Sequence, residues 1–137
     1  MIRILIVDDH HQFRVLLKTV LESVKEWQVC GEAQNGVEAI EKHYRIQPHV
    51  TVMDFNMPDL NGLLASREIL RKYPNAIILL VTIHVSAQLA QQAKNEGIKG
   101  YCAKTQADCI TSAIESLLRG ETYFPESFMA QAGTDRD

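Results

Sequence analysis

The sequence lacks the features that define several large classes of protein. Its 137 residues contain no apolar stretch near the roughly 20 residues that span a bilayer, so we expect no membrane association. The formal net charge is −3 without a run of like charges or a basic stripe, which argues against direct binding of nucleic acid. The three cysteines form no CxxC motif, and their odd number favours a reduced protein in the cytoplasm.

What the sequence contains is typical of one globular domain. Hydrophobic residues make up 46% and charged residues 23% of the chain, a balance that supports an ordinary core. The N-terminus has a short apolar run, but it leads directly into carboxylates without a small-residue cleavage site. We therefore interpret it as a strand and not as a signal peptide.

Apolar runs alternate with helical periodicities along the chain. Five runs predict strands, and the apolar spacings of three and four between them predict helices. The strands are expected at 2–7, 27–33, 49–53, 76–81 and 98–103, and the helices at 13–24, 37–47, 63–73, 85–96 and 110–118. Five strand–helix units predict an α/β fold with a parallel sheet and helices on both faces.

Local signals refine this pattern. Asn35-Gly36 predicts a turn, Gly97 a helix C-cap, and Thr105 the start of a capping box. The apolar face of helix 13–24 would include Leu16. Helix 85–96 offers only one leucine and two alanines to the core, so it should be loosely held.

Polar residues follow four of the five predicted strands. Asp8 and Asp9 come after the first, Asp54 after the third, Thr82 after the fourth and Lys104 after the fifth. Parallel strands share their carboxyl ends at one edge of the sheet, which is where such sheets bind ligands. Three carboxylates, a hydroxyl and an ammonium group would then face one another. Such a set can hold a divalent cation and accept a phosphoryl group.

The crowded carboxylates predict a magnesium site. Close carboxylates repel one another unless a cation neutralises them, and Mg²⁺ takes oxygen ligands. Asp9 and Asp54 are the expected direct ligands, with Asp8 acting through water and the backbone carbonyl of Asn56 completing the set. The plainer alternative is that some of these acids only cap helices, as Asp9 would before the first helix.

Asp54 is the expected nucleophile. A carboxylate can form a mixed anhydride with phosphate, and the transfer mostly needs positioning and charge neutralisation. Lys104 would pair with the phosphoryl oxygens as a point charge, and Thr82 would donate a hydrogen bond to one of them. Taken alone, Thr82 and Lys104 would be an ordinary strand residue and an ordinary surface lysine.

The segments "ILIVDDH", "VTVMDFNMPDLNG", "LLVT" and "GYCAK" together resemble the receiver domain of bacterial two-component response regulators, over residues 2–120. The resemblance implies a flavodoxin-like (βα)5 doubly wound sandwich with strand order 2-1-3-4-5. It implies that a sensor histidine kinase phosphorylates Asp54, and that Asp9, Asp54 and the Asn56 carbonyl bind Mg²⁺ with help from Asp8.

The same resemblance assigns switch roles to further residues. Thr82 and Lys104 match the family's switch hydroxyl and phosphate-binding lysine, and Tyr101 matches an aromatic side chain that would turn inward on phosphorylation. Asn56 and His84 occupy positions that tune the phosphate lifetime in the family. Thr105 departs from the family pattern, because many receivers have proline at this place.

The C-terminal segment resembles the LuxR/NarL-type transcription regulators, through "NEGIKGYCAK" and the later "RGETYFP". We expect a receiver at 1–120 and a tail, or the start of a linker, at 121–137. The phosphorylated receiver would act through the face built by residues 85–118, with homodimerisation possible, and would reach DNA only through a helix-turn-helix domain beyond this chain. A stand-alone receiver that acts by protein–protein contact is the alternative.

A magnesium-dependent phosphohydrolase of the haloacid-dehalogenase type is a further alternative. Such enzymes carry a second acid two residues after the nucleophile, but here that position holds His10 or Asn56. We therefore expect no enzyme beyond self-phosphorylation and autodephosphorylation of Asp54.

Overall fold

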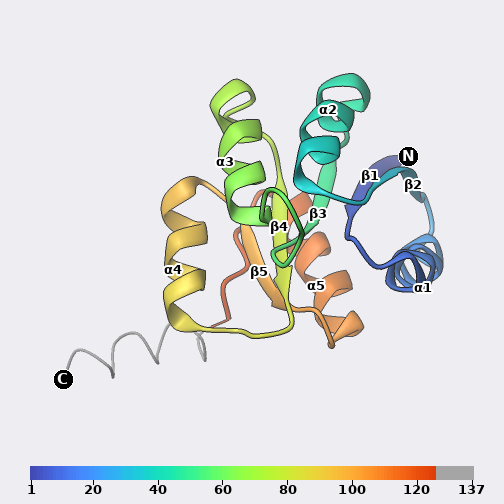
Figure 1. The fold of residues 1–137 in the computed structure, drawn as a ribbon. Coiled ribbons are helices and arrows are strands. Elements are labelled where there is room, and N and C mark those ends of the chain that lie inside the picture. Colours follow the sequence, from blue (N-terminus) through green and yellow to red (C-terminus); the bar gives the residue numbers. More distant parts are fainter. Residues whose placement is uncertain (126–137) are drawn as a thin grey trace.

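Strands and helices alternate strictly along the computed structural model, which describes residues 1–125 (Figure 1). The strands are β1 Ile2–Val7, β2 Trp27–Ala33, β3 Val50–Asp54, β4 Ile78–Thr82 and β5 Gly100–Ala103. The helices are α1 His11–Glu22, α2 Gly36–Ile46, α3 Gly62–Lys72, α4 Ala87–Glu96 and α5 Ala107–Leu118. All five strand–helix units expected from the sequence are present.

The strands form one parallel sheet in the order β2-β1-β3-β4-β5, as predicted. The chain starts at β1, next to one edge of the sheet, moves to β2 at that edge, then crosses back over β1 to β3 and proceeds to β5 at the other edge. The reversal beside β1 creates a switch point at the carboxyl ends of β1 and β3, where sheets of this kind bind ligands. No helix within residues 1–125 is long and apolar enough to cross a membrane.

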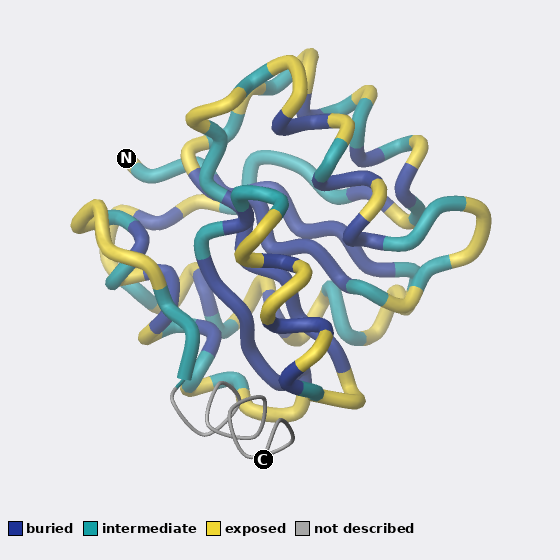
Figure 2. Tube along the Cα trace, turned by 90° about the vertical axis from the view of Figure 1, so that its left-hand side faces the viewer, coloured by how far each residue is buried: buried dark blue, intermediate teal, exposed yellow. Residues whose placement is uncertain are grey.

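Side chains from each strand are buried on both faces of the sheet, because successive residues of a strand point to opposite sides. One core lies between the sheet and α2, α3 and α4, and it includes Leu5, Met53 and Leu80. The other lies between the sheet and α1 and α5, and it includes Ile6 and Val52. The strands are accordingly the most buried part of the trace in Figure 2.

The helix ends agree with some expectations and differ from others. The side chain of Asn35 accepts a hydrogen bond from the Glu38 N–H, so Asn35-Gly36 is the N-terminal boundary of α2 and not a separate turn. Gly97 adopts the left-handed conformation that ends α4, as predicted. The capping box at Thr105 was a wrong prediction: Gln106 is the N-cap residue of α5, and its side chain makes no capping hydrogen bond.

The apolar stripe of α1 is narrower than predicted. Leu17 and Leu21 are buried, whereas Leu16 is 58% exposed. Adjacent side chains on a helix point about 100° apart. Because Leu17 points toward the sheet and α5, its neighbour Leu16 points toward solvent. In α2, the apolar residues Val37 and Tyr44 are likewise exposed.

The described part of the C-terminal tail pairs with the edge of the sheet. Tyr123 forms a parallel bridge with Gly100. The Tyr101 N–H donates to the Tyr123 carbonyl at 2.9 Å, and the Tyr123 N–H donates to the Lys99 carbonyl at 2.9 Å. This short pairing covers backbone groups that an edge strand otherwise leaves open. Residues 126–137 lie outside the described part of the chain, so the division at residue 120 stays a prediction.

Candidate functional site

The polar residues expected at the sheet edge lie at the ends of four strands. Asp54 is the last residue of β3 and Thr82 the last of β4, while Asp8 follows β1 and Lys104 follows β5. All four are buried, including Asp54 at 1% and Lys104 at 7% exposure. Burying polar or charged side chains costs free energy unless they have hydrogen-bond or ionic partners, so these four residues need partners or a ligand.

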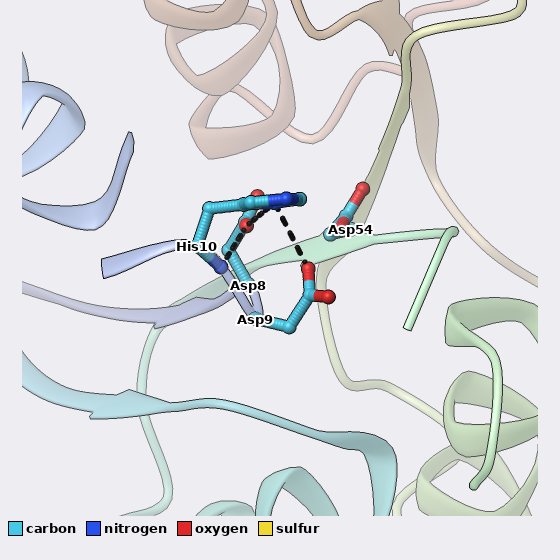
Figure 3. A group of neighbouring side chains, drawn as sticks. All are labelled: Asp8, Asp9, His10 and Asp54. Carbon is cyan, nitrogen blue, oxygen red and sulfur yellow. Dashed lines mark hydrogen bonds and ion pairs between the residues drawn. The ribbon is translucent and has the colours of Figure 1, made fainter. Parts of the chain in front are cut away.

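An acidic cluster forms the centre of the site (Figure 3). Asp8, Asp9, His10 and Asp54 each place one candidate ligand atom within 4.8 Å of the others. Nδ1 of His10 lies 3.1 Å from Asp9 Oδ1 and 3.3 Å from Asp8 Oδ1. Sequence reasoning gave His10 no role here, although its position directly after the acidic pair was a sufficient signal.

Lys104 is the cation of the cluster. Its Nζ lies 2.8 Å from Asp8 Oδ2 and 3.6 Å from Asp54 Oδ2. The same ammonium group lies 3.4 Å from His10 Nδ1 and 4.7 Å from the centre of the Phe13 ring. The lysine therefore links the end of β5 to the ends of β1 and β3 and offsets part of their negative charge.

The carboxyl group of Asp54 is strongly perturbed. Burial first, and then the neighbouring charge of Asp8, raise its pKa from 3.8 to about 7, although Lys104 acts in the opposite direction. The desolvation of a carboxylate beside a second carboxylate explains this direction. A cation at the cluster would favour the ionised form.

The carboxylate oxygens fit a hard cation. Among the described residues, no donor meets hydrogen-bond geometry at either Asp54 oxygen, at Asp8 Oδ2 or at Asp9 Oδ1, all of which are buried, although the Asn56 backbone N–H is close enough to lower the pKa of Asp54. Asp8 Oδ2 and Asp9 Oδ1 still make the ion-pair contacts given above, which lack hydrogen-bond geometry. Buried oxygens with unused lone pairs from three carboxylates are a donor set suited to Mg²⁺.

The other predicted residues surround the cluster at different distances. The Thr82 hydroxyl donates to the Asn56 side-chain oxygen at 3.1 Å, which joins β4 to the loop after β3. Asn56 and His84 are both exposed, in the loops that follow β3 and β4. The described residues contain no cis peptide bond, so the chain passes from Lys104 to Thr105 in the trans form.

The ring of Tyr101 lies in a different position from the one expected before phosphorylation. We expected its ring to turn inward on phosphorylation, but the ring is already fully buried in β5. Its hydroxyl accepts a hydrogen bond from the Ser86 N–H at 3.1 Å, directly before α4. Burial of the ring and this hydrogen bond together favour the inward position, and they tie β5 to the start of α4.

The loop between β3 and α3 depends on Gly62, the first residue of α3. A Cβ atom on Gly62 would lie 2.1 Å from the Asp54 carbonyl oxygen, closer than any side chain allows. The Gly62 N–H donates to the Phe55 carbonyl at 3.0 Å, and Asn61 caps α3. The absence of a side chain thus lets the loop fold back against the strand end that carries Asp54.

Comparison with known proteins identifies similar chains. The family model described as "Response regulator receiver domain" matches residues 4–115. The transcriptional regulatory protein DegU of Brevibacillus brevis is 32% identical over 123 residues, which cover 89% of this chain and 52% of DegU. The chain thus spans about half the length of this curated relative.

Solved structures show the same architecture. A LuxR-family two-component response regulator from Aurantimonas sp. SI85-9A1 superposes with a TM-score of 0.92 at 29% identity, covering 96% of this chain and 97% of that one. The signal receiver domain of NarL from Mycobacterium tuberculosis gives a TM-score of 0.80 at 27% identity, covering 88% and 98%.

Proposed function

Since the chain belongs to the response regulator receiver domain family and resembles its LuxR/NarL type, we propose that it is a phosphorylation-dependent signalling switch whose phosphoacceptor is Asp54. The observation that carries this proposal is the approach of Lys104 Nζ to the buried Asp54 carboxylate, 3.6 Å from one of its oxygens. A buried carboxylate beside a single ammonium group suits the transfer of a phosphoryl group.

The proposed donor is a phosphohistidine on a sensor histidine kinase. An Asp54 oxygen bonds to phosphorus as the bond between phosphorus and the imidazole nitrogen breaks, and the histidine takes up a proton. The product is an acyl phosphate. Attack by water on its phosphorus restores the carboxylate and releases inorganic phosphate. Because Asp54 is the single proposed acceptor, each chain holds at most one phosphoryl group at a time.

Lys104 and Thr82 would recognise the phosphoryl group. The ammonium group is already held between β1 and β3, so it can pair with phosphoryl oxygens on Asp54 as a point charge. The Thr82 hydroxyl, which now donates to Asn56, can donate to a phosphoryl oxygen after a rotation about one side-chain bond. Asn56 and His84 are the proposed determinants of phosphate lifetime, since both are exposed and stand two residues after Asp54 and Thr82.

Magnesium is the proposed cofactor, held by Asp9, Asp54 and the Asn56 carbonyl, with Asp8 acting through water. When bound, Mg²⁺ would neutralise the charge that accumulates on the phosphoryl oxygens. The rest of the site would hold the carboxylates close together, keep bulk water away from Asp54 and place Lys104 opposite the acceptor oxygen.

The proposed output is a change in the face formed by α4, β5 and α5. The Tyr101 hydroxyl in β5 already accepts a hydrogen bond from Ser86, the residue that caps α4. A shift of Thr82 or Lys104 that moves Tyr101 would therefore also move the start of this helix. We propose that, in the cytoplasm, this face contacts one of two partners and changes its activity: a second copy of the chain, or a helix-turn-helix domain that binds DNA. The receiver would occupy residues 1–120, with 121–137 as a tail or linker.

The experiment is labelling with acetyl phosphate and Mg²⁺, comparing the wild type with Asp54→Asn and Asp59→Asn. Asp59 is an exposed aspartate in the loop that follows Asp54, and its positive φ of 69° suits asparagine equally well, which makes it a matched control. We expect labelling of the wild type and of Asp59→Asn, and loss of labelling in Asp54→Asn. Wild-type labelling of Asp54→Asn would refute the assignment.

A further inference from the structure

Two cysteines outside the acidic cluster bring their sulfur atoms together. Sγ of Cys102 in β5 and Sγ of Cys109 in the first turn of α5 lie 3.2 Å apart, and both thiols are free. A disulfide needs a separation of about 2.05 Å, so the two atoms must approach by only about 1 Å. The sequence placed the two residues seven positions apart without indicating this contact.

The surroundings make the two thiols unequal. Cys102 is fully buried, its thiol donates to the Cys109 carbonyl at 3.6 Å, and burial raises its pKa. Cys109 is partly exposed and lines an open pocket of about 440 Å³ with residues 105–108. A small water-soluble reagent therefore reaches Cys109 first.

Tyr123 adds a polar group beside Cys109. Its hydroxyl lies 3.4 Å from the Cys109 sulfur. The hydrogen bond with Cys109, followed by burial, raises the pKa of Tyr123 to about 12, so the hydroxyl keeps its proton at neutral pH. The thiolate of Cys109 is the form that reacts with oxidants.

We propose that Cys102 and Cys109 are a redox-active pair that hydrogen peroxide converts into an intramolecular disulfide. The Cys109 thiolate attacks one peroxide oxygen and the O–O bond breaks, which gives a sulfenic acid and a hydroxide that is protonated to water. The Cys102 sulfur then attacks the Cys109 sulfur, and the S–O bond breaks. The departing hydroxide takes the Cys102 thiol proton and leaves as a second water.

The bond would close a short loop that includes Lys104. Residues 102–109 contain the end of β5, the segment 104–106 and the first turn of α5. The disulfide would tie these elements together directly beside the site. The inference is independent of the proposed phosphorylation, because neither thiol belongs to the acidic cluster.

Cys30 provides an internal control. It lies in β2, at the opposite edge of the sheet from β5, where its thiol donates to the Ile4 carbonyl at 3.3 Å. It cannot reach the other two thiols within one folded chain. The Cys30→Ser variant should therefore leave the pair and its oxidation intact.

The test treats the folded protein with hydrogen peroxide, then unfolds and alkylates it for intact-mass and peptide analysis. We expect the number of alkylated thiols to fall from three to one in the wild type and from two to none in Cys30→Ser, with one peptide pair joined through Cys102 and Cys109. Cys102→Ser should instead accumulate a sulfenic acid on Cys109 that dimedone traps.

Three results would overturn the proposal. These are three thiols remaining in the treated wild type, a disulfide through Cys30 or between two chains, and a Cys109 sulfinic acid with Cys102 still free. The wild-type and Cys30→Ser measurements decide the matter even where the buried Cys102→Ser substitution prevents folding.

Discussion

At the scale of single residues, the site consists of groups whose charges are balanced only in part. Asp8 and Lys104 form a close ion pair at 2.8 Å, but Asp54 lies farther from the same ammonium group at 3.6 Å. Burial and, after it, the neighbouring charge of Asp8 therefore raise the pKa of Asp54 to about 7, and Lys104 offsets this only in part. Strongly perturbed groups of this kind concentrate at functional sites.

The first prediction concerns the pH dependence of stability without metal. Because the pKa of Asp54 rises from 3.8 to about 7 on folding, the folded chain binds a proton that the unfolded chain has already released between these values. Raising the pH therefore favours unfolding. In a chelator, this group should lower the free energy of unfolding by about 2–4 kcal/mol between roughly pH 4 and pH 8.

Urea unfolding of the wild type and Asp54→Asn across this range measures the effect. The other titrating groups largely cancel in the difference, so the stability of Asp54→Asn relative to the wild type should increase as the pH rises. A difference that stays constant with pH would contradict the raised pKa.

A second prediction concerns Lys104. Replacing it with methionine keeps similar volume but leaves buried carboxylates without their cation, so metal-free stability should fall by roughly 3 kcal/mol near pH 8. The loss should be smaller near pH 5, where Asp54 is protonated. Lys25→Met, at an exposed position, is the control and should stay within about 0.5 kcal/mol of the wild type. Equal stability of Lys104→Met and Lys25→Met at both pH values would argue against the ion pair.

At the scale of elements, α4 is the helix whose packing depends most on small side chains. Its buried face consists of Leu89 and the alanines 87, 90 and 93, and it is held further by an ion pair between Arg67 in α3 and Glu96. Small side chains bury little apolar area, so this helix should open locally at lower free energy than its neighbours.

The third prediction follows from the hydrogen bond between Tyr101 and the Ser86 N–H. Tyr101→Phe keeps the buried ring but removes the acceptor, at a cost of about 1 kcal/mol. Amide hydrogen exchange should then accelerate at Ser86 and in the first turn of α4. Tyr44→Phe, at an exposed position in α2, should leave these rates unchanged. Unchanged rates in both variants would show that this hydrogen bond does not hold the helix.

The sequence predicted elements better than it predicted their contacts. Strand 2–7 is a nearly continuous apolar run that ends at an acidic pair, which indicates both its type and its limits. Helix faces were less certain, because periodicity marks an apolar side while its buried width depends on the neighbouring element. Leu16 is exposed for this reason.

At the scale of the whole molecule, the parallel topology accounts for the site. Once five strands run in one direction, residues 46 and 50 positions apart along the chain, such as Asp8, Asp54 and Lys104, must share one edge. That convergence followed from the sequence. The buried position of Tyr101, the pairing of Tyr123 with β5 and the contact of the two thiols did not, since each depends on how separate elements pack.

The most direct measurement is the chemical position of the phosphoryl group. The wild-type protein is labelled with acetyl phosphate and Mg²⁺, reduced with borohydride so that an acyl phosphate becomes an alcohol, and mapped by peptide mass spectrometry. We predict conversion of Asp54 to homoserine in one peptide, dependent on both the phosphodonor and Mg²⁺. Conversion at another carboxylate, with Asp54 unmodified, would contradict the central claim.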